Sequence, residues 1–205
     1  MVEPTGNREL FTRCLMQYNE YPERRAEIVA RIERHFQRIR GIMVIDSSDF
    51  TRTVHQIGII PFLANLERIA RLIIPCIERH GGKLLKREAD NLFAVFPGAT
   101  SALEAAIESC RHVEIANKPL PASSEIHISI GLGYGKVLVI GEEDIFGDEM
   151  NLTCKLGEDL AERDEILLTT AAHANLANPL PQFEQVAYVV AGRSIDAFRV
   201  LRERI

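Results

Sequence analysis

The sequence predicts an α+β fold, with a ferredoxin-like βαββαβ core followed by extra C-terminal strands and helices. Apolar runs of strand length alternate with two long segments of helical periodicity, and glycines and prolines mark the boundaries between them. The strand-like runs are 41–45, 84–85, 92–96 and 126–130, and the helical segments are 59–80 and 99–116. Their order is strand, helix, strand, strand, helix, strand.

Length and composition restrict the class of protein. The chain has 205 residues, 46% of them hydrophobic, which is typical of one globular core with an appendage. A net charge of -5, low aromatic content and no Trp argue against a nucleic-acid partner. No apolar leader is visible, and charged residues interrupt the longest apolar stretch, so we expect no membrane association and a cytoplasmic location. The four cysteines form no C-x-x-C pair and favour a reducing compartment.

The N-terminal part is expected to be helical over residues 7–40, with an interruption near Pro22. A short heptad seam runs through it, formed by Val29, Ile32, Phe36 and Ile39. Two heptads fit either a helix packed on its own domain or a parallel coiled coil. We therefore divide the chain into an N-terminal helical segment, 1–40, and a main domain, 41–205. The sequence identifies no regulatory partner for these helices.

Two strand-like runs lead to an aspartate. The first, 41–45, is followed by Asp46 and then by a polar stretch, 47–51, that is typical of a helix start. The second aspartate, Asp90, lies in the turn of a predicted β-hairpin over 81–96. Asp followed by Asn is ordinary turn chemistry. Two carboxylates at strand ends before a helix N-terminus, however, indicate a site for divalent metal and phosphate.

The segment at 59–80 is an amphipathic helix that Gly81 ends. Its buried stripe is expected to hold Leu63, Leu66, Ile69, Ala70 and Ile73. Further on, three glycines at 131, 133 and 135 are expected to form a turn between the strand at 126–130 and a separate strand at 137–141. Bends or close backbone approach explain these glycines better than phosphate binding does.

A helix is expected over residues 148–160, where Asn151 and Lys155 lie four apart and so on one face. The remaining strands and the short alanine-rich helix are interpreted as packing elements.

Over residues 41–201 these features resemble the catalytic domain of the class III nucleotidyl cyclases. Four motifs of that family occur in the expected order. The strand-end motif is found at Asp46, Phe50 and Thr51. The hairpin motif G-G-x-x-x-K-x-x-G-D is matched at Gly81, Gly82, Lys86 and Asp90. The motif I-G-x-x-x-G-x-V is matched at Ile130, Gly131, Gly135 and Val137. The motif D-x-x-G-x-x-V-N-x-A-x-R is matched at Asp144, Gly147 and Asn151.

The resemblance implies a role for each matching residue. Asp46 and Asp90, with Ser47, would hold two divalent ions per site, Mg²⁺ or Mn²⁺. Backbone N–H groups at the helix start would bind the terminal phosphates, in the segment Ser47, Ser48, Asp49, Phe50 and Thr51. Asn151 and Lys155 would orient the ribose and stabilise charge on the α-phosphate.

The resemblance also assigns the purine base to Lys86 and Asp144, with the adjacent Ile145. A Lys donates to N1 of adenine and an Asp accepts from its exocyclic amine, whereas guanylate enzymes typically have Glu and a small residue there. These residues therefore favour ATP as the substrate. In the family the metal acids and the base-reading residues come from opposite subunits, which implies a homodimer with composite sites.

Three positions depart from the family pattern. Lys155 replaces an Arg and offers a point charge instead of a rigid fork, which favours low turnover. Asp49 replaces a Gly, and a carboxylate ~4 Å from a phosphate charge would cost about 4 kcal/mol at an effective dielectric of ~20. Ala89 replaces the Gly before Asp90, which matters only if that position has a positive φ. Arg193 is interpreted as a surface residue rather than a triphosphate contact.

The leading hypothesis is an adenylate cyclase that forms 3′,5′-cyclic AMP and pyrophosphate from ATP. The alternative is a degenerate cyclase-homology domain that binds nucleotide or a partner for regulation without turnover. The metal acids and the base-reading pair favour the first, and Asp49 and Lys155 favour the second. A diguanylate cyclase is disfavoured because the chain has no G-G-D/E-E-F run.

Overall fold

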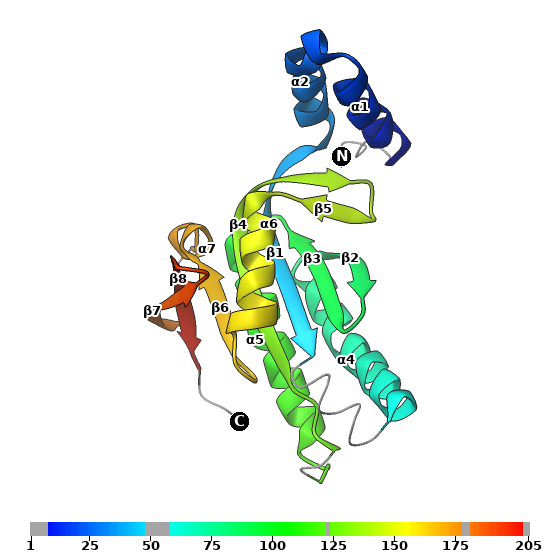
Figure 1. The fold of residues 1–205 in the computed structure, drawn as a ribbon. Helices are drawn as coiled ribbons and strands as arrows, with labels where there is room; N and C mark the ends of the chain where they lie inside the picture. Colours follow the sequence, from blue (N-terminus) through cyan, green and yellow to red (C-terminus); the bar gives the residue numbers. More distant parts are fainter. Residues whose placement is uncertain (1–7, 48–57, 122–123, 178–180, 203–205) are drawn as a thin grey trace.

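One eight-stranded sheet with helices on both faces makes up most of the described chain, which comprises residues 8–47, 58–121, 124–177 and 181–202 of a computed structural model (Figure 1). The strands are β1 Gln37–Ser47, β2 Lys83–Glu88, β3 Asn91–Phe96, β4 Ile128–Ile140, β5 Asp144–Phe146, β6 Ile166–Thr169, β7 Gln182–Val190 and β8 Arg193–Leu201. The helices are α1 Arg8–Glu20, α2 Arg25–Phe36, α4 Ile59–Arg79, α5 Ala99–Asn117, α6 Asp148–Cys154 and α7 Thr170–Ala174. A π-helical segment, Lys155–Leu160, continues from α6.

The strand order confirms the predicted frame. Neighbours in the sheet run β2-β3-β1-β4-β6-β8-β7, and β5 pairs with β4 as a short hairpin. All pairs are antiparallel except β4 with β6. Strand β1, helix α4, the β2–β3 hairpin, helix α5 and strand β4 therefore form the βαββαβ core, and β6 to β8 extend it on one side.

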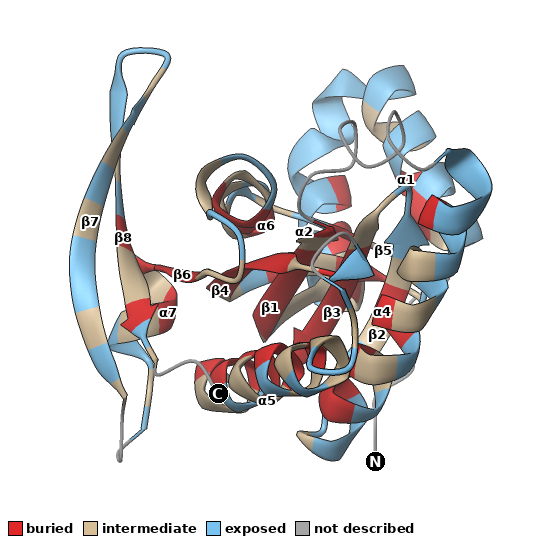
Figure 2. Cartoon of the chain, turned by 90° about the horizontal axis from the view of Figure 1, so that it is seen from below, coloured by how far each residue is buried: buried red, intermediate tan, exposed pale blue. Residues whose placement is uncertain are grey.

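Helices α4 and α5 cover one face of the sheet, and α6 lies on the other (Figure 2). Strand β1 contributes to both cores, because Met43 and Ile45 pack beneath α4 and α5 while Ile42 and Val44 pack toward α6. A strand buried on both faces reads as a continuous apolar run rather than an alternating one. This explains the run before Asp46 and fixes that carboxylate at the end of a rigid central strand.

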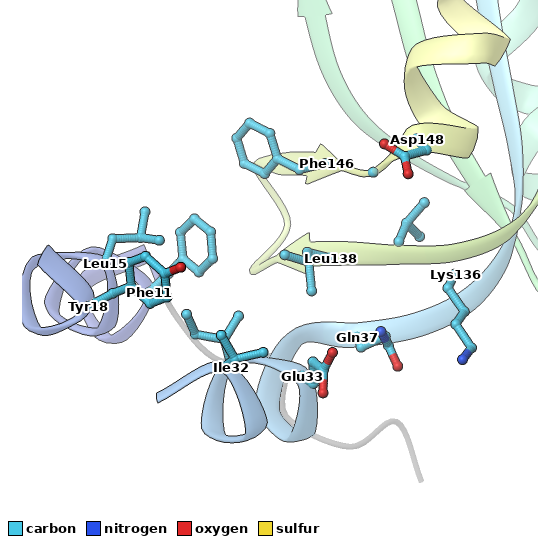
Figure 3. A pocket seen from close by; sticks show the side chains of 13 residues that line it. Phe11, Leu15, Tyr18, Ile32, Glu33, Gln37, Lys136, Leu138, Phe146 and Asp148 are labelled. Atoms are coloured by element: carbon cyan, nitrogen blue, oxygen red, sulfur yellow. The ribbon is translucent and has the colours of Figure 1, made fainter. Parts of the chain in front are cut away.

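The N-terminal helices pack on the chain itself. Helix α1 lies against α2 and against the β4–β5 hairpin, where Phe11, Phe36 and Ile140 are buried together. The rings of Phe11 and Phe36 meet edge to face at 5.1 Å. Between these helices and β4 is a hollow of about 460 Å³, and Figure 3 shows Tyr18 and Leu138 among its lining side chains. Of the expected seam, Ile32 and Phe36 thus pack within this chain, whereas Val29 is 40% exposed.

The boundary of this N-terminal segment differs from the prediction. Helix α2 ends at Phe36, and the next four residues belong to β1, where Gln37 pairs with Leu138 and Arg40 with Gly135. The expected helix to residue 40 is therefore wrong, because pairing with β4 outweighs the local helical periodicity. Ile39, expected in the seam, is 51% exposed.

The three glycines of β4 are not in a turn. The strand runs unbroken from Ile128 to Ile140, so the expected break between two short strands is wrong. A Cβ at Gly131 would lie 2.3 Å from the carbonyl oxygen of Thr153, and one at Gly133 would lie 2.0 Å from its hydroxyl oxygen. The glycines let α6 approach the strand backbone closely, which is the second explanation that the sequence offered.

Two helices also differ in detail from those expected from the sequence. Helix α4 has the expected length and ends in a left-handed Gly81, with Gly82 N–H bonded to the Ile77 carbonyl at 2.9 Å. Leu63, expected in its buried stripe, is 51% exposed, and Phe62 is buried in its place. The buried arc is thus centred one position earlier at the start of the helix. The helix expected over 148–160 changes to π geometry at Lys155.

Every cysteine is a free thiol, and each lies in a helix as expected from the sequence. None of the helices in the described ranges is long and apolar enough to cross a membrane.

Candidate active site

Asp46 and Asp90 meet at one end of the sheet. Asp46 follows the last residue of β1 that pairs with β3, and Asp90 lies in the β2–β3 turn directly before β3. Burial raises the pKa of Asp46 to about 7, and the charges of Asp90 and Glu158 and a hydrogen bond with Asp90 act in the same direction. The predicted juxtaposition of two strand-end carboxylates is therefore present within one chain.

A third acid, Glu158, joins this pair and was not singled out from the sequence. It comes from the π-helical segment and accepts a hydrogen bond of 3.3 Å from the side-chain amide of Asn91. Partial burial and the nearby charges of Asp159 and Asp90 raise the pKa of Glu158. The change from α to π geometry shifts the helical register, so helical spacing along the sequence did not indicate this position.

The donor set at this end of the sheet suits a hard divalent cation. Asp46, Asp90 and Glu158 offer carboxylate oxygens, and Asn91 Oδ1 is buried with no hydrogen-bond partner in the described chain. Mg²⁺ and Mn²⁺ prefer oxygen ligands. A cation here would also offset the burial and the like charges that raise the pKa of Asp46. The residues present therefore fit the divalent metals that cyclases generally use.

Of the proposed phosphate-binding segment, the structure describes only Ser47. It is the last residue of β1, is 8% exposed and pairs with Ile128 of β4. Ser48, Asp49, Phe50 and Thr51 lie outside the described residues.

The turn that carries Asp90 has an unusual backbone. Ala89 has φ +52°, a left-handed conformation that glycine adopts without steric cost. The position therefore does require a positive φ, and the departure from the family glycine at Ala89 has a structural consequence. The strain lies directly beside a metal-binding candidate.

Lys86 and Asp144 are also in contact. Lys86 Nζ lies 3.2 Å from Asp144 Oδ1 and 2.8 Å from Glu88 Oε2, and it sits over the ring of Phe93. Lys86 comes from β2 and Asp144 opens β5, so the tertiary fold joins residues 58 positions apart. Ile145, the neighbour of Asp144, is buried among apolar side chains and fixes the strand that carries it.

The carboxylate of Asp144 is surrounded by donors. Its Oδ1 accepts from the N–H of Ile145 at 3.0 Å, and its Oδ2 accepts from Arg8 at 3.0 Å. Desolvation acts to raise the pKa of Asp144, but the hydrogen bonds from Arg8, Ile145 and Lys86 together lower it. Arg8 comes from α1 and also bonds Glu143. No sequence motif identified Arg8, because 136 positions of the chain separate it from Asp144.

Asn151 and Lys155 lie on consecutive turns after β5, as predicted. Asn151 is exposed on α6, and Lys155 opens the π-helical segment. Lys155 Nζ is bonded to Asp159 Oδ2 at 2.7 Å. Arg193 is exposed at the tip of the β7–β8 hairpin, which fits a surface residue.

Comparisons with solved structures support the fold. The chain is similar to an adenylate/guanylate cyclase/hydrolase from Silicibacter pomeroyi, with TM-score 0.71, 23% identity, and coverage of 82% of this chain and 98% of that one. It is also similar to the guanylyl cyclase Cya2, with TM-score 0.70, 18% identity and coverage of 80% and 92%. The adenylyl cyclase CyaB from P. aeruginosa gives TM-score 0.69, 19% identity and coverage of 82% and 97%.

A curated relative in Rhizobium meliloti (strain 1021) is named "Putative adenylate cyclase 3" and is 24% identical over 137 residues. The match spans 67% of this chain but only 23% of that protein. No family model matches the sequence. The chain therefore has the fold of class III adenylate and guanylate cyclase catalytic domains, and within it Asp46 lies beside Asp90 while Lys86 contacts Asp144.

Proposed function

We propose that the protein is an adenylate cyclase, in which the ribose 3′-hydroxyl of ATP attacks the α-phosphate in line and pyrophosphate leaves. The observation that carries this proposal is the 3.2 Å contact between Lys86 Nζ and Asp144 Oδ1. It places a donor beside an acceptor, which matches N1 and the exocyclic amine of adenine. Guanine presents a donor at N1 and an acceptor at O6, so a guanine bound in the same orientation would face Lys86 with a donor and Asp144 with an acceptor and remain unsatisfied.

Asp46, Asp90 and Ser47 would hold the divalent ions. When bound, Mg²⁺ or Mn²⁺ activates the 3′-hydroxyl and neutralises charge on the triphosphate. The carboxylate of Asp46 binds a cation only after losing its proton, and burial raises its pKa to about 7. Activity is therefore expected to rise as the pH increases toward neutrality.

Asn151 and Lys155 are assigned to the ribose and to the charge that develops on the α-phosphate. Lys155 has to leave Asp159, to which it is bonded at 2.7 Å, before it can contact a phosphate. That exchange and the lack of a bidentate fork both favour low turnover.

We infer that the complete site forms between two copies of the chain. In such a homodimer the acids of one subunit would face Lys86, Asp144 and Asn151 of the other. Two features support this: the exposure of Asn151 on α6 and the resemblance to a family of dimeric domains. Each dimer would hold two equivalent sites.

One observation favours the alternative, a nucleotide-binding regulatory domain without turnover. The ion pair of Lys155 with Asp159 withdraws the only cation assigned to the α-phosphate among the described residues. In that case the protein would bind nucleotide without converting it to a cyclic product.

The test is an assay of purified protein with ATP and with GTP, each in Mg²⁺ and in Mn²⁺. We expect cyclic AMP and little cyclic GMP, and higher turnover in the variant Lys155→Arg because the guanidinium restores two parallel donors. Asp46→Asn serves as the inactive control. ATP binding without cyclic product in both the parent and Lys155→Arg would favour the regulatory alternative.

A further inference from the structure

Helices α4 and α5 lie on the face of the sheet opposite α6 (Figure 2). Between them Cys76, Glu108 and His112 are grouped as potential metal ligands, and His80 lies beside Glu108. Cys76 lies in the last turn of α4 and His80 directly follows that helix, while Glu108 and His112 lie one turn apart on α5. Cys76 Sγ is 3.5 Å from His112 Nδ1, and His80 Nε2 is 2.8 Å from Glu108 Oε2. The C-terminal end of α4 and the residue after it thus contribute two side chains, four residues apart, that contact a pair with the same spacing on α5.

The distances are those of a small coordination sphere. Ligand atoms of Cys76, Glu108 and His112 all lie within 4.8 Å of one another, and His112 Nε2 is 3.7 Å from Glu108 Oε1. Tetrahedral zinc with bonds of about 2.0 to 2.3 Å separates its ligand atoms by roughly 3.3 to 3.8 Å. The side chains of His80 and Glu108 are each about a quarter exposed, so small movements of the two would bring His80 into this arrangement.

We propose that Cys76, His80, Glu108 and His112 bind one Zn²⁺ ion that joins α4 to α5. A thiolate, two imidazoles and a carboxylate form a set that zinc prefers and that Mg²⁺ does not. The site lies apart from Asp46 and Asp90, which offer oxygen atoms alone. It goes beyond the proposed cyclase activity and does not depend on it.

The surroundings suit a site with one buried and one open side. Cys76 is fully buried beneath the other ligands, and Glu104 and Arg111 line a hollow over His80 and His112. Without metal, the Cys76 thiol donates to the Leu72 carbonyl oxygen at 3.3 Å. Zinc would displace this proton.

A network of ion pairs is the competing explanation. Glu108 also pairs with Arg79, and His80 Nδ1 lies 3.4 Å from Glu104. Arg79 is more than half exposed, so it can leave Glu108 at little cost. The ion pairs account for Glu108 and for the histidines. They do not account for a thiol placed 3.5 Å from an imidazole nitrogen at the base of the cluster.

The test uses full-length protein carrying Asp46→Asn, which weakens metal binding at the candidate active site. It is titrated with Zn²⁺ alone by calorimetry and with Co²⁺ alone by absorption spectroscopy. We expect one ion per chain and, with Co²⁺, the intense near-ultraviolet charge-transfer band that only a thiolate ligand gives. Zinc should also raise the melting temperature, since it binds the folded state alone.

Cys76→Ser and His112→Gln should each weaken zinc binding by at least about tenfold and remove the rise in melting temperature. Cys110→Ala and Arg111→Gln are the matched controls, since they alter a thiol and a side chain beside the site, and both should bind zinc as the parent does. Zinc affinity unchanged in Cys76→Ser and His112→Gln, or a Co²⁺ spectrum without the thiolate band, would overturn the proposal. Either result leaves the cyclase assay unaffected.

Discussion

The two halves of the candidate active site contain carboxylates in opposite electrostatic settings. At the end of β1, Asp46 lies beside Asp90 and Glu158, and burial among like charges raises its pKa to about 7. At the start of β5, Asp144 is also partly buried, yet Arg8 and Lys86 pair with it and its pKa is lowered. Asp46 and Asp144 are thus the same residue type in environments that favour different binding partners.

Under the proposed function, this contrast would separate metal binding at Asp46 from base recognition at Asp144. A cluster of uncompensated carboxylates is unfavourable until a cation arrives, so it is suited to bind a divalent ion. A carboxylate held by fixed donors is already ionised at neutral pH and oriented, so it can discriminate between hydrogen-bonding patterns. Helix α1 contributes to the electrostatic environment of Asp144 through Arg8, which links the N-terminal helices to the Lys86–Asp144 pair.

The largest effect on activity is expected from removing the carboxylate charge of Asp46. Asp46→Asn should lower cyclic AMP formation by about 10³-fold or more, because several kcal/mol of metal stabilisation are lost at about 1.4 kcal/mol per tenfold. Steady-state kinetics at saturating Mn²⁺ measures this.

Mixing tests whether the two halves belong to different subunits. Asn151→Ala should be nearly inactive alone. An equal mixture with Asp46→Asn that exchanges subunits should recover about a quarter of parental activity, since about half of the dimers then hold one intact site. A mixture that stays inactive after proven exchange would show that the sites are not shared.

The next prediction alters Lys86 and Asp144, the half of the site in which charges are paired. Lys86→Glu combined with Asp144→Cys should change the ratio of kcat/KM for ATP to that for GTP by about 10²-fold in favour of GTP, because unpaired polar groups reject the wrong base. Competition assays with both nucleotides measure the ratio. Loss of ATP activity without any gain on GTP would show damage only, and an unchanged ratio would contradict the assignment of the base site.

A further prediction uses pH to distinguish the electrostatic environments of Asp46 and Asp144 in metal-free protein. The folded-state pKa of Asp46, about 7, exceeds the unfolded value of about 3.9, so ionising Asp46 removes stability as the pH rises from 4 to 7. The free energy of unfolding of Asp46→Asn, taken relative to that of the parent, should therefore be larger at pH 8 than at pH 5. Urea unfolding in a chelator measures this difference.

Asp144 should show the opposite sign. Its folded-state pKa is lowered, so its contribution to stability is present above the unfolded value and is lost as the pH falls below about 4. Asp144→Asn should then differ least from the parent under acidic conditions. Equal pH profiles for the two variants would contradict the electrostatic contrast.

The smallest effect on activity is expected from replacing Arg8 of α1, which donates a hydrogen bond to Asp144. Arg8→Ala releases one oxygen of Asp144, so the exocyclic amine of adenine gains an acceptor and the KM for ATP should fall by about two- to fivefold. Arg8→Lys, which retains the charge, is the control. A KM that rises instead would show that Arg8 orients Asp144 for the base.

The sequence by itself determined the order of elements and the identity of the chemical groups. The apolar run before Asp46, the hairpin around Asp90 and the spacing of Asn151 and Lys155 follow from local periodicity and turn chemistry, and the fold confirms each. These features depend on neighbours within a few residues, which a single sequence displays directly.

Only the tertiary structure decided the features that depend on distant backbone. The glycines of β4 serve the approach of α6, β1 begins at Gln37 because β4 pairs with it, and π geometry brings Glu158 to the acids. The contact of Arg8 with Asp144, and that of Cys76 with His112, likewise join elements far apart in the chain. Burial and charge at such sites are set by packing across the sheet, which local sequence patterns do not encode.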